Sequence, residues 1–199
     1  MKNDKYSPLI EEHHNLTNQL NKSRKQIYKL SNFDTLTSLP NRNRLINTFN
    51  SSIKQGNKTG KAIFLIDVDR FHSINELYGR EIGDKLLVEI ANRLHGLLVT
   101  KNTIFRDNED EFFIVLDNVS YYEIRQYANE IQHAVNKPYN VDGRMIYITV
   151  SIGLSHYPMT AQDIETLLLQ AEIAMFKVKN SGKNNFQVFL LEDAEIVER

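Results

Sequence analysis

The N-terminal stretch, residues 1–31, has a helical spacing of apolar positions that sets it apart from the rest of the chain. Large apolar residues recur there with charged and amide side chains between them: Leu9, Leu16, Leu20, Ile27 and Leu30. Polar His13 and Ser23 interrupt this seam. The pattern predicts a weakly amphipathic helix of heptad type. Because such a helix needs packing to persist, it either packs on its own domain or forms a two-stranded coiled coil that carries a signal from an upstream module.

From Phe33 onward, patterns typical of strands alternate with patterns typical of helices. The strand patterns are KAIFLIDVD (61–69), TIFR and EFFIVL as the arms of a hairpin (103–116), MIYITVSIGLSHY (145–157) and NFQVF (185–189). The first is a continuous apolar run that ends in carboxylates, which is typical of a central strand buried on both faces. Gly153 is expected to mark a β-bulge.

Amphipathic stretches predict the helices of the same region. They are 40–53, 71–77, 82–98, 120–135 and 163–180. Pro40 is expected at the first helical position of the first helix, and Ser181-Gly182 as the C-cap of the last. This alternation predicts a mixed sheet covered by helices, an α/β (α+β) fold.

Composition excludes several classes of protein. A chain of 199 residues fits one domain with appendages. The absence of cysteine excludes a disulfide framework and a Cys-based zinc site. A balance of 24 basic and 25 acidic residues argues against a nucleic-acid binder. The start lacks the apolar region of a signal peptide, and no apolar run approaches the roughly 18 to 20 residues of a membrane span, so we expect a cytoplasmic protein with no membrane segment.

Carboxylates gather at two predicted strand ends. The hairpin tip carries Asp107, Glu109, Asp110 and Glu111, and the central strand ends in Asp67 and Asp69. Ligands of open α/β sheets usually bind at strand ends, and carboxylates without His or Cys suit Mg²⁺ and its phosphate ligands. From spacing alone a simpler alternative stays open, in which the first pair caps a strand and the hairpin acids point into water.

Other chemistry has less support. The histidines lack ligand spacing, and SGKNN lacks the upstream glycine and the Ser or Thr after Lys183 that a phosphate-binding P-loop requires. There is no nucleophile elbow. Lys179 and Lys183 flank a helix end, where cations stabilise the helix dipole; they could equally bind phosphate.

Four stretches together resemble the GGDEF family, the diguanylate cyclase domains that condense two GTP into cyclic di-GMP. They are DTLTSLPNR (34–42), FLIDVDRFHSINELYGREIGDKLL (64–87), FRDNEDEF (105–112) and AEIAMFKVKNSGKNNFQVF (171–189). The resemblance covers Phe33 to Phe189 and implies a five-stranded mixed sheet surrounded by helices, similar to the palm of nucleotide cyclases and polymerases, with an N-terminal helical extension.

The resemblance implies roles for the strand-end residues. Asp67, the Val68 backbone carbonyl and Asp110 correspond to the family's metal ligands, which would hold Mg²⁺ or Mn²⁺ when nucleotide is bound. Glu111 corresponds to the catalytic Glu of the G-G-[DE]-E-F signature.

It also implies a GTP site. Asn75 and Asp84 correspond to the pair that reads the guanine edge, for which an amide and a carboxylate are suited. Lys179 and Lys183 correspond to two cations near the terminal phosphates, the second of which is usually Arg in the family.

The departures from the family pattern fall on the phosphate site. Asn108 and Glu109 replace two glycines that let backbone N–H groups approach the triphosphate. Asn108 is expected to preserve the turn because Asn tolerates the left-handed backbone region. Glu109 adds a charge whose repulsion at about 4 Å is roughly 1 kcal/mol in water and about 4 at an effective dielectric near 20. His72, mostly neutral at pH 7, replaces a phosphate-facing Lys.

Two further comparisons concern regulation. Val99 and Asn102 stand where active members carry an inhibitory RxxD motif, so no such site is expected. The tail LEDAEIVER resembles the connector to an EAL phosphodiesterase domain, which makes an attached EAL domain and an upstream sensor expected partners. We divide the chain into a signalling or linker helix (1–31), a GGDEF domain (32–190) and a C-terminal connector (191–199).

Three functions therefore compete. The first is a degenerate GGDEF domain that binds GTP with Mg²⁺ and regulates an attached domain. The second is an active diguanylate cyclase, which needs two protomers to present GTP face to face. The third is a dimerisation or interaction module without nucleotide, with the N-terminal helix as the homodimer contact.

Overall fold

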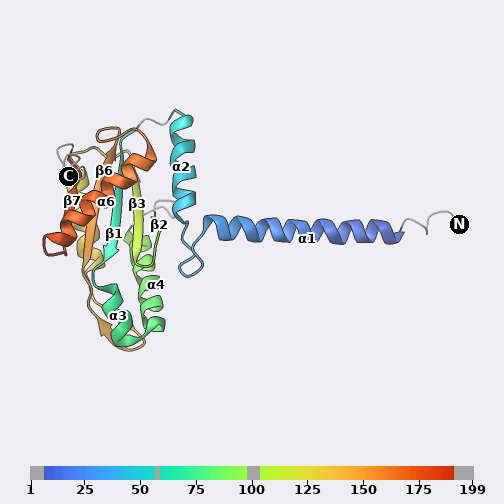
Figure 1. The fold of residues 1–199 in the computed structure, drawn as a ribbon, viewed down its shortest axis with the longest axis horizontal. Coiled ribbons are helices and arrows are strands. Elements are labelled where there is room, and N and C mark those ends of the chain that lie inside the picture. Colours follow the sequence, from blue (N-terminus) through green and yellow to red (C-terminus); the bar gives the residue numbers. More distant parts are fainter. Residues whose placement is uncertain (1–6, 57–58, 98–103, 191–199) are drawn as a thin grey trace.

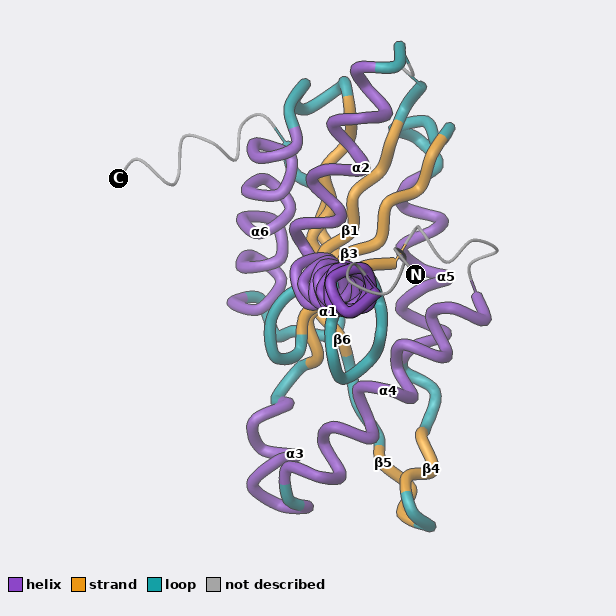
Figure 2. The backbone as a smooth tube through the Cα atoms, turned by 90° about the vertical axis from the view of Figure 1, so that its right-hand side faces the viewer, coloured by secondary structure: helices purple, strands orange, loops and turns teal. Residues whose placement is uncertain are grey.

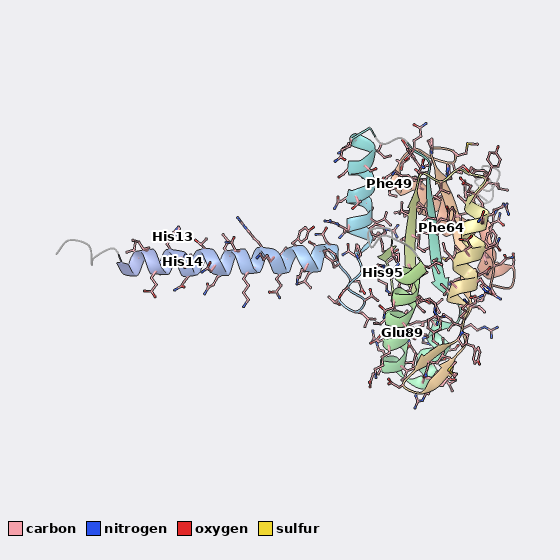
Figure 3. The ribbon with its side chains drawn as sticks, turned by 180° about the vertical axis from the view of Figure 1, so that it is seen from behind. His13, His14, Phe49, Phe64, Glu89 and His95 are labelled. Carbon is pink, nitrogen blue, oxygen red and sulfur yellow. The ribbon has the colours of Figure 1, made fainter. Side chains whose placement is uncertain are left out.

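The computed structural model describes residues 7–56, 59–97 and 104–190, and its first element is a long helix that projects from the body. This is α1 (Ser7–Asn32), and His13 and His14 on it lie far from the rest of the chain (Figures 1 and 3). All the seam residues are exposed, from 51% for Leu20 to 68% for Leu9. The apolar seam therefore does not pack on the body, contrary to the first of the two interpretations. Only the last turns of α1 contact α2, where Arg44 lies over the Tyr28 ring.

A five-stranded sheet in the order β2-β3-β1-β6-β7 forms the centre of the body. Its strands are β1 (Lys61–Val68), β2 (Ile104–Arg106), β3 (Glu111–Asp117), β6 (Val150–Tyr157) and β7 (Phe186–Val188). Neighbouring strands are antiparallel except for β6 and β7, so the sheet is mixed, as predicted. β1 lies at its centre and is buried along its whole length.

Helices cover both faces of this sheet (Figure 2). They are α2 (Arg42–Lys54), α4 (Arg80–Leu97), α5 (Ile124–Val135) and α6 (Ile164–Asn180), while α3 (Phe71–Tyr78) lies beyond one end of the sheet and packs on α4. Successive side chains of β1 point to opposite faces, so Ile63 and Leu65 pack with α2 and α6, while Phe64 and Ile66 pack with α4 and α5. Phe49 of α2 and Phe64 both lie inside the body (Figure 3).

Two local predictions are wrong. Gly153 is not a bulge, because it pairs in regular register with Leu65. A Cβ at this position would lie 1.9 Å from the backbone oxygen of Ala171, so the glycine lets α6 approach the sheet closely. Pro40 does not begin α2; the helix begins at Arg42, and Asn41 is its N-cap.

A small second sheet was not predicted as a separate hairpin. It consists of β4 (Tyr139–Val141) and β5 (Arg144–Ile146). Asp142 and Gly143 join them with φ angles of 51° and 79°, which suits the two-residue turn of a tight hairpin. No helix in the described part of the chain is both long enough and apolar enough to span a membrane.

Candidate active site at the ends of β1 and β3

The ends of β1 and β3 meet at one edge of the sheet. Asp67 on β1 pairs with Glu111 on β3 across the antiparallel ladder. The Val68 backbone N–H donates to the Asp110 carbonyl oxygen over 3.2 Å. The two acidic strand ends therefore lie side by side. Asp67 is buried, at 3% exposed, and the hairpin acids Asp110 and Glu111 are half-buried rather than fully in water.

Asp67 is a buried carboxylate with one satisfied oxygen. Its Oδ2 accepts a hydrogen bond from Lys179 Nζ on α6, whereas its Oδ1 is buried without a hydrogen-bond partner. Burial raises the pKa of Asp67 to about 6, with the Lys179 hydrogen bond opposing this and the Asp110 charge adding to it. A buried acceptor without a partner is costly, so this oxygen is a place where an added cation would be stabilising.

The neighbouring acids are also partly desolvated. Burial raises the pKa of Asp110 against the lowering effect of Lys179 and Arg106. Burial likewise raises the pKa of Glu111, and the hydrogen bond from Asn108 opposes it. The carboxylates at this edge thus repel one another, and a metal ion would relieve that repulsion.

The donor set fits a hard divalent cation. No group of three or more His, Cys, Asp or Glu side chains among the described residues is placed to hold a metal by itself. Asp67, Asp110 and the Val68 carbonyl are oxygen donors of the kind that hold Mg²⁺ when phosphate oxygens and water complete its coordination. Bound there, Mg²⁺ would neutralise phosphate charge and polarise a phosphoryl oxygen.

Arg106, a buried residue of β2, stabilises the hairpin. Its guanidinium donates to the Glu109 carbonyl oxygen and lies 4.5 Å from the centre of the Phe112 ring. Its backbone N–H donates to the Pro40 carbonyl oxygen over 2.8 Å. The tip is therefore fixed both to its own strand and to the segment before α2.

Arg42 accounts for the extra acid Asp107. Arg42 Nη1 lies 2.7 Å from the Asp107 carboxylate, whose side chain is 6% exposed, and Nη2 lies 3.1 Å from Glu172 on α6. Of the crowded hairpin acids, Asp107 is thus neutralised by a structural ion pair. These contacts join residues that are far apart in the sequence, and no spacing pattern signals them.

The two residues that replace glycines do not strain the backbone. Within the described residues, the non-glycine positions with positive φ do not include Asn108 or Glu109, so the left-handed backbone considered for Asn108 is not found. The turn itself is present, and the Glu111 N–H donates to the Asn108 carbonyl oxygen over 3.4 Å. Asn108 Nδ2 instead donates to Glu111 Oε2 over 3.2 Å. Glu109 is exposed at the tip. Both changes therefore act through their side chains.

Asn75 and Asp84 lie on helices that pack together, α3 and α4. The Asn75 Oδ1 is buried without a hydrogen-bond partner. It sits against Gly83, where a Cβ would lie only 1.8 Å away. Gly83 therefore creates the space for this amide, a role that the sequence alone did not indicate. Asp84, the next residue of α4, is half-buried and lines a separate hollow with Glu81 and Asn140.

The remaining cation positions are more exposed. His72 is 86% exposed and lies 3.2 Å from Glu76, one turn along α3. Lys183 follows α6 with a φ of 64° and lines a groove with Arg70 and Thr149, whereas Lys179 contacts Asp67. Lys179 thus lies at the carboxylate edge, and Lys183 lies in the turn beside that groove.

Asp69 is a structural acid rather than a free one. Its carboxylate accepts hydrogen bonds from Thr149 and Ser151, each at 2.7 Å, and from the Asn184 backbone N–H at 3.1 Å. It therefore fixes the turn that carries Lys183. Its place two residues after Asp67 was the only signal in the sequence.

The positions compared with the inhibitory RxxD motif, Val99 and Asn102, and the tail 191–199 lie outside the described residues.

The five-stranded mixed sheet, with a buried acidic end of its central strand beside an acidic hairpin, defines a domain of the nucleotide-cyclase kind. Residues 31–185 match the family model described as diguanylate cyclase, GGDEF domain, and the chain belongs to this family. The predicted fold class is confirmed by solved structures. The GGDEF domain of TpbB (YfiN) from Pseudomonas aeruginosa has a TM-score of 0.74 and 30% identity over 84% of this chain and 99% of that one.

A longer relative and a further structure extend the comparison. The bifunctional diguanylate cyclase/cyclic di-GMP phosphodiesterase MucR of P. aeruginosa is 29% identical over 176 residues, which cover 87% of this chain and 26% of MucR. The chain thus spans about a quarter of this curated relative's length. The coiled coil and GGDEF domain of DgcB from Caulobacter crescentus, in complex with c-di-GMP, has a TM-score of 0.76 over 93% of this chain and 100% of that one; at 18% identity it shows the fold alone.

Proposed function

We propose that this GGDEF domain of cyclic di-GMP signalling binds GTP with Mg²⁺, has little or no cyclase activity, and regulates an attached domain such as an EAL phosphodiesterase. The observation that carries the proposal is the contrast between two parts of one site. Asn75 is half-buried, and its Oδ1, without a hydrogen-bond partner in the space left by Gly83, supports recognition of a base. Glu109 and Asn108, by contrast, add a charge and bulk to the hairpin where phosphates would lie.

The hairpin chemistry favours impaired catalysis. Glu109 adds an anion near the phosphates, and Asn108 donates to Glu111, the carboxylate assigned to catalysis by family resemblance. His72 is exposed to solvent. It replaces the Lys that in the family pattern faces the phosphates, so one cation that would help to hold phosphate is missing. Asp67, Asp110 and the Val68 carbonyl remain suited to Mg²⁺, so we infer weak binding rather than none.

Regulation through α1 is part of the proposal. The apolar seam of α1 is exposed along its length, and burying it against a second copy would remove that surface from water. In a dimer formed through α1, a conformational change in an upstream sensor would change the orientation of the two helices and, through them, of the two bodies.

Calorimetry with GTP and Mg²⁺ tests binding, and the Asn75→Ala variant tests where GTP binds. We expect measurable heat for the unaltered chain and a clear loss of affinity in the variant. Absence of heat at millimolar GTP would favour a nucleotide-free interaction module.

Chromatography of products after incubation with GTP and Mg²⁺ tests catalysis. We expect no appreciable cyclic di-GMP from a dimeric sample. Formation at the rate of an active family member, run in parallel as the control, would establish an active diguanylate cyclase and overturn this part of the proposal.

A further inference from the structure

A groove beside the acidic strand ends is lined by two cationic side chains without a partner. The groove has a volume of about 510 Å³ and lies between α3 and the segment that leads into β6. Arg70, the residue before α3, and Lys183, which follows α6, both line it. Within the part of the chain that the structure describes, neither side chain forms a hydrogen bond or an ion pair. A ligand in this groove would therefore meet two cations that no acid of the chain has neutralised.

The lining of the groove favours an anion. Its one acid, Asp69, already accepts hydrogen bonds from two hydroxyl groups and one backbone N–H. The other described lining residues, apart from Arg70 and Lys183, are uncharged. Two cations and one acid leave the groove with a net positive charge, which attracts an anionic ligand.

Asp69 also fixes the two cations relative to each other. Arg70 is the neighbour of Asp69 in the sequence. The Asp69 carboxylate accepts the Asn184 N–H over 3.1 Å, and Asn184 is the neighbour of Lys183. Each cation is thus one residue away from a contact with the same buried carboxylate.

Asn184 is held from a second side as well. Its Oδ1 accepts hydrogen bonds from Asn136 Nδ2 over 2.7 Å and from Gln132 Nε2 over 3.4 Å, at the end of α5. Lys183 and Asn184 have φ angles of 64° and 49°, in the left-handed region that few non-glycine residues adopt. The contacts of Asn184 therefore hold the Lys183 turn in a conformation that the backbone alone does not favour.

The place of the groove in the fold identifies the anion. Arg70 comes shortly after Val68, at the end of β1 that is suited to Mg²⁺. Because Mg²⁺ is commonly bound by carboxylates together with substrate phosphates, phosphates are the anions expected at this edge. Arg70 and Asn75 are separated by about 7.5 Å along α3, at roughly 1.5 Å per residue. A nucleotide whose base lies at Asn75 can therefore place its phosphates at the start of α3, beside the groove.

We propose that Arg70, together with Lys183, binds the terminal phosphates of GTP, and that Asn184 is the positioning residue that keeps Lys183 at the groove. This inference rests on the proposed GTP site and adds Arg70 and Asn184 to it. Arg70 takes the place of the cation that is missing at His72, whose side chain is 86% exposed. The pair accounts for GTP binding that is weakened but not lost.

Titration calorimetry with sodium tripolyphosphate, without Mg²⁺, tests the cation pair, because this probe has no base and needs no metal. Arg70→Gln and Lys183→Gln should each lower the affinity about tenfold, through the loss of a charge-assisted hydrogen bond. Lys183→Arg keeps the charge and should bind like the unaltered chain. Arg125→Gln is the matched control, since Arg125 is exposed on α5 and does not line the groove, and it should leave the affinity unchanged.

Nucleotides separate phosphate binding from base binding. In the presence of Mg²⁺, Arg70→Gln should weaken the binding of GTP about tenfold, but it should leave the affinity for GMP, which lacks the terminal phosphates, nearly unchanged. Asn75→Ala should weaken the binding of both nucleotides and not that of tripolyphosphate. Retained GMP affinity in the Arg70 variant shows that its base site is intact.

Asn184→Gly tests the positioning role. Glycine readily adopts the positive φ of this position, so the variant removes only the side chain that binds α5. It should weaken tripolyphosphate binding about as much as Lys183→Gln does, and combining the two substitutions should weaken binding no further. Additive losses in the double variant would show that Asn184 does not act through Lys183.

The outcomes distinguish this proposal from the proposed GTP site. Equal tripolyphosphate affinity in Arg70→Gln and Arg125→Gln, or no binding to the unaltered chain, would overturn the cation pair even if GTP binds. Tripolyphosphate binding that depends on Arg70, in a chain that gives no heat with GTP, would instead support the pair and overturn the GTP site.

Discussion

At the scale of residues, the signature hairpin carries side chains at the two positions where the family signature has glycines, and neither position has a positive φ. Asn108 and Glu109 adopt no left-handed backbone, so returning them to glycine removes side chains without requiring a new turn. Asp107, the other added acid at the tip, forms an ion pair with Arg42 and so has a structural role in the hairpin. Glu109, which is exposed at the tip, is therefore the acid that we expect to oppose nucleotide binding most directly.

Replacing both residues, Asn108→Gly with Glu109→Gly, should raise the affinity for GTP in the presence of Mg²⁺ by about tenfold, or roughly 1.4 kcal/mol. Titration calorimetry measures this change. Glu109→Gln is the control that removes the charge but keeps the bulk, and it should recover part of the gain. An unchanged dissociation constant in the double variant would contradict our account of the hairpin.

Gly83→Ala should weaken GTP binding about as much as Asn75→Ala does. The new methyl group would lie 1.8 Å from Asn75 Oδ1 and would push that amide out of its place. The fold should survive, because the displaced group is the end of a side chain and Ala is favoured over Gly in a helix by about 1 kcal/mol.

Gly96→Ala is the matched control for this substitution. It lies on the same helix with nothing within 4 Å of the added methyl group, so it should leave GTP binding intact. Equal affinity in the Gly83→Ala and unaltered chains would show that Asn75 does not read the base.

At the scale of elements, the cap of α6 gives a pH-dependent stability. The Asp163 carboxylate accepts the Thr166 N–H over 2.8 Å, and this backbone hydrogen bond lowers the pKa of Asp163. A lowered pKa in the folded state means that the stabilisation is present above the ordinary pKa of 3.8 and is lost as the pH falls through the folded value.

Asp163→Ala should therefore lower the free energy of unfolding by about 1 kcal/mol at pH 7 and by much less at acid pH, where the carboxyl is protonated. Urea unfolding at several pH values measures this. Asp163→Asn keeps a capping oxygen at all pH values, and it should show neither the loss at pH 7 nor the acid dependence of the cap. A pH-independent effect of Asp163→Ala would contradict the assignment.

The contact of α6 with the sheet makes Gly153 sensitive to any side chain. Gly153→Ala places a methyl group 1.9 Å from a backbone oxygen and 2.4 Å from a backbone nitrogen of α6, so α6 must move. We expect a loss of about 2 to 3 kcal/mol in the free energy of unfolding, measured by chemical denaturation. A loss below about 0.5 kcal/mol, as for an ordinary surface change, would mean that α6 lies further from the sheet.

Some of these elements could be predicted from the sequence and others could not. The apolar run of β1 and the strand-end acids Asp67 and Asp110 predict the central strand and the location of the site, because period and strand direction are local properties. Gly153 and Gly83 were not understood from the sequence, because their reason is the approach of a neighbouring helix or side chain. The β4–β5 turn does carry a local signal, because Asp142-Gly143 is a sequence typical of a tight hairpin.

At the scale of the whole molecule, the exposed seam of α1 predicts self-association. Leu16→Glu with Leu20→Glu should shift the chain from dimer to monomer in sedimentation equilibrium, since charges in a seam oppose pairing. Lys22→Glu, a surface change elsewhere on the same helix, is the control for added charge. A sedimentation profile unchanged by the seam variant would contradict pairing through α1.

The segment between α1 and α2 is hydrogen-bonded at both of its ends. On one side the Asn41 N–H donates to Asn32 at the end of α1, over 2.9 Å, and on the other Pro40 accepts from Arg106 while Arg42 binds Asp107. These contacts connect the end of α1 to Arg106, the last residue of β2, and to Asp107 at the start of the hairpin tip. We therefore expect a change in the orientation of α1 to alter the position of the hairpin, with or without cyclase activity.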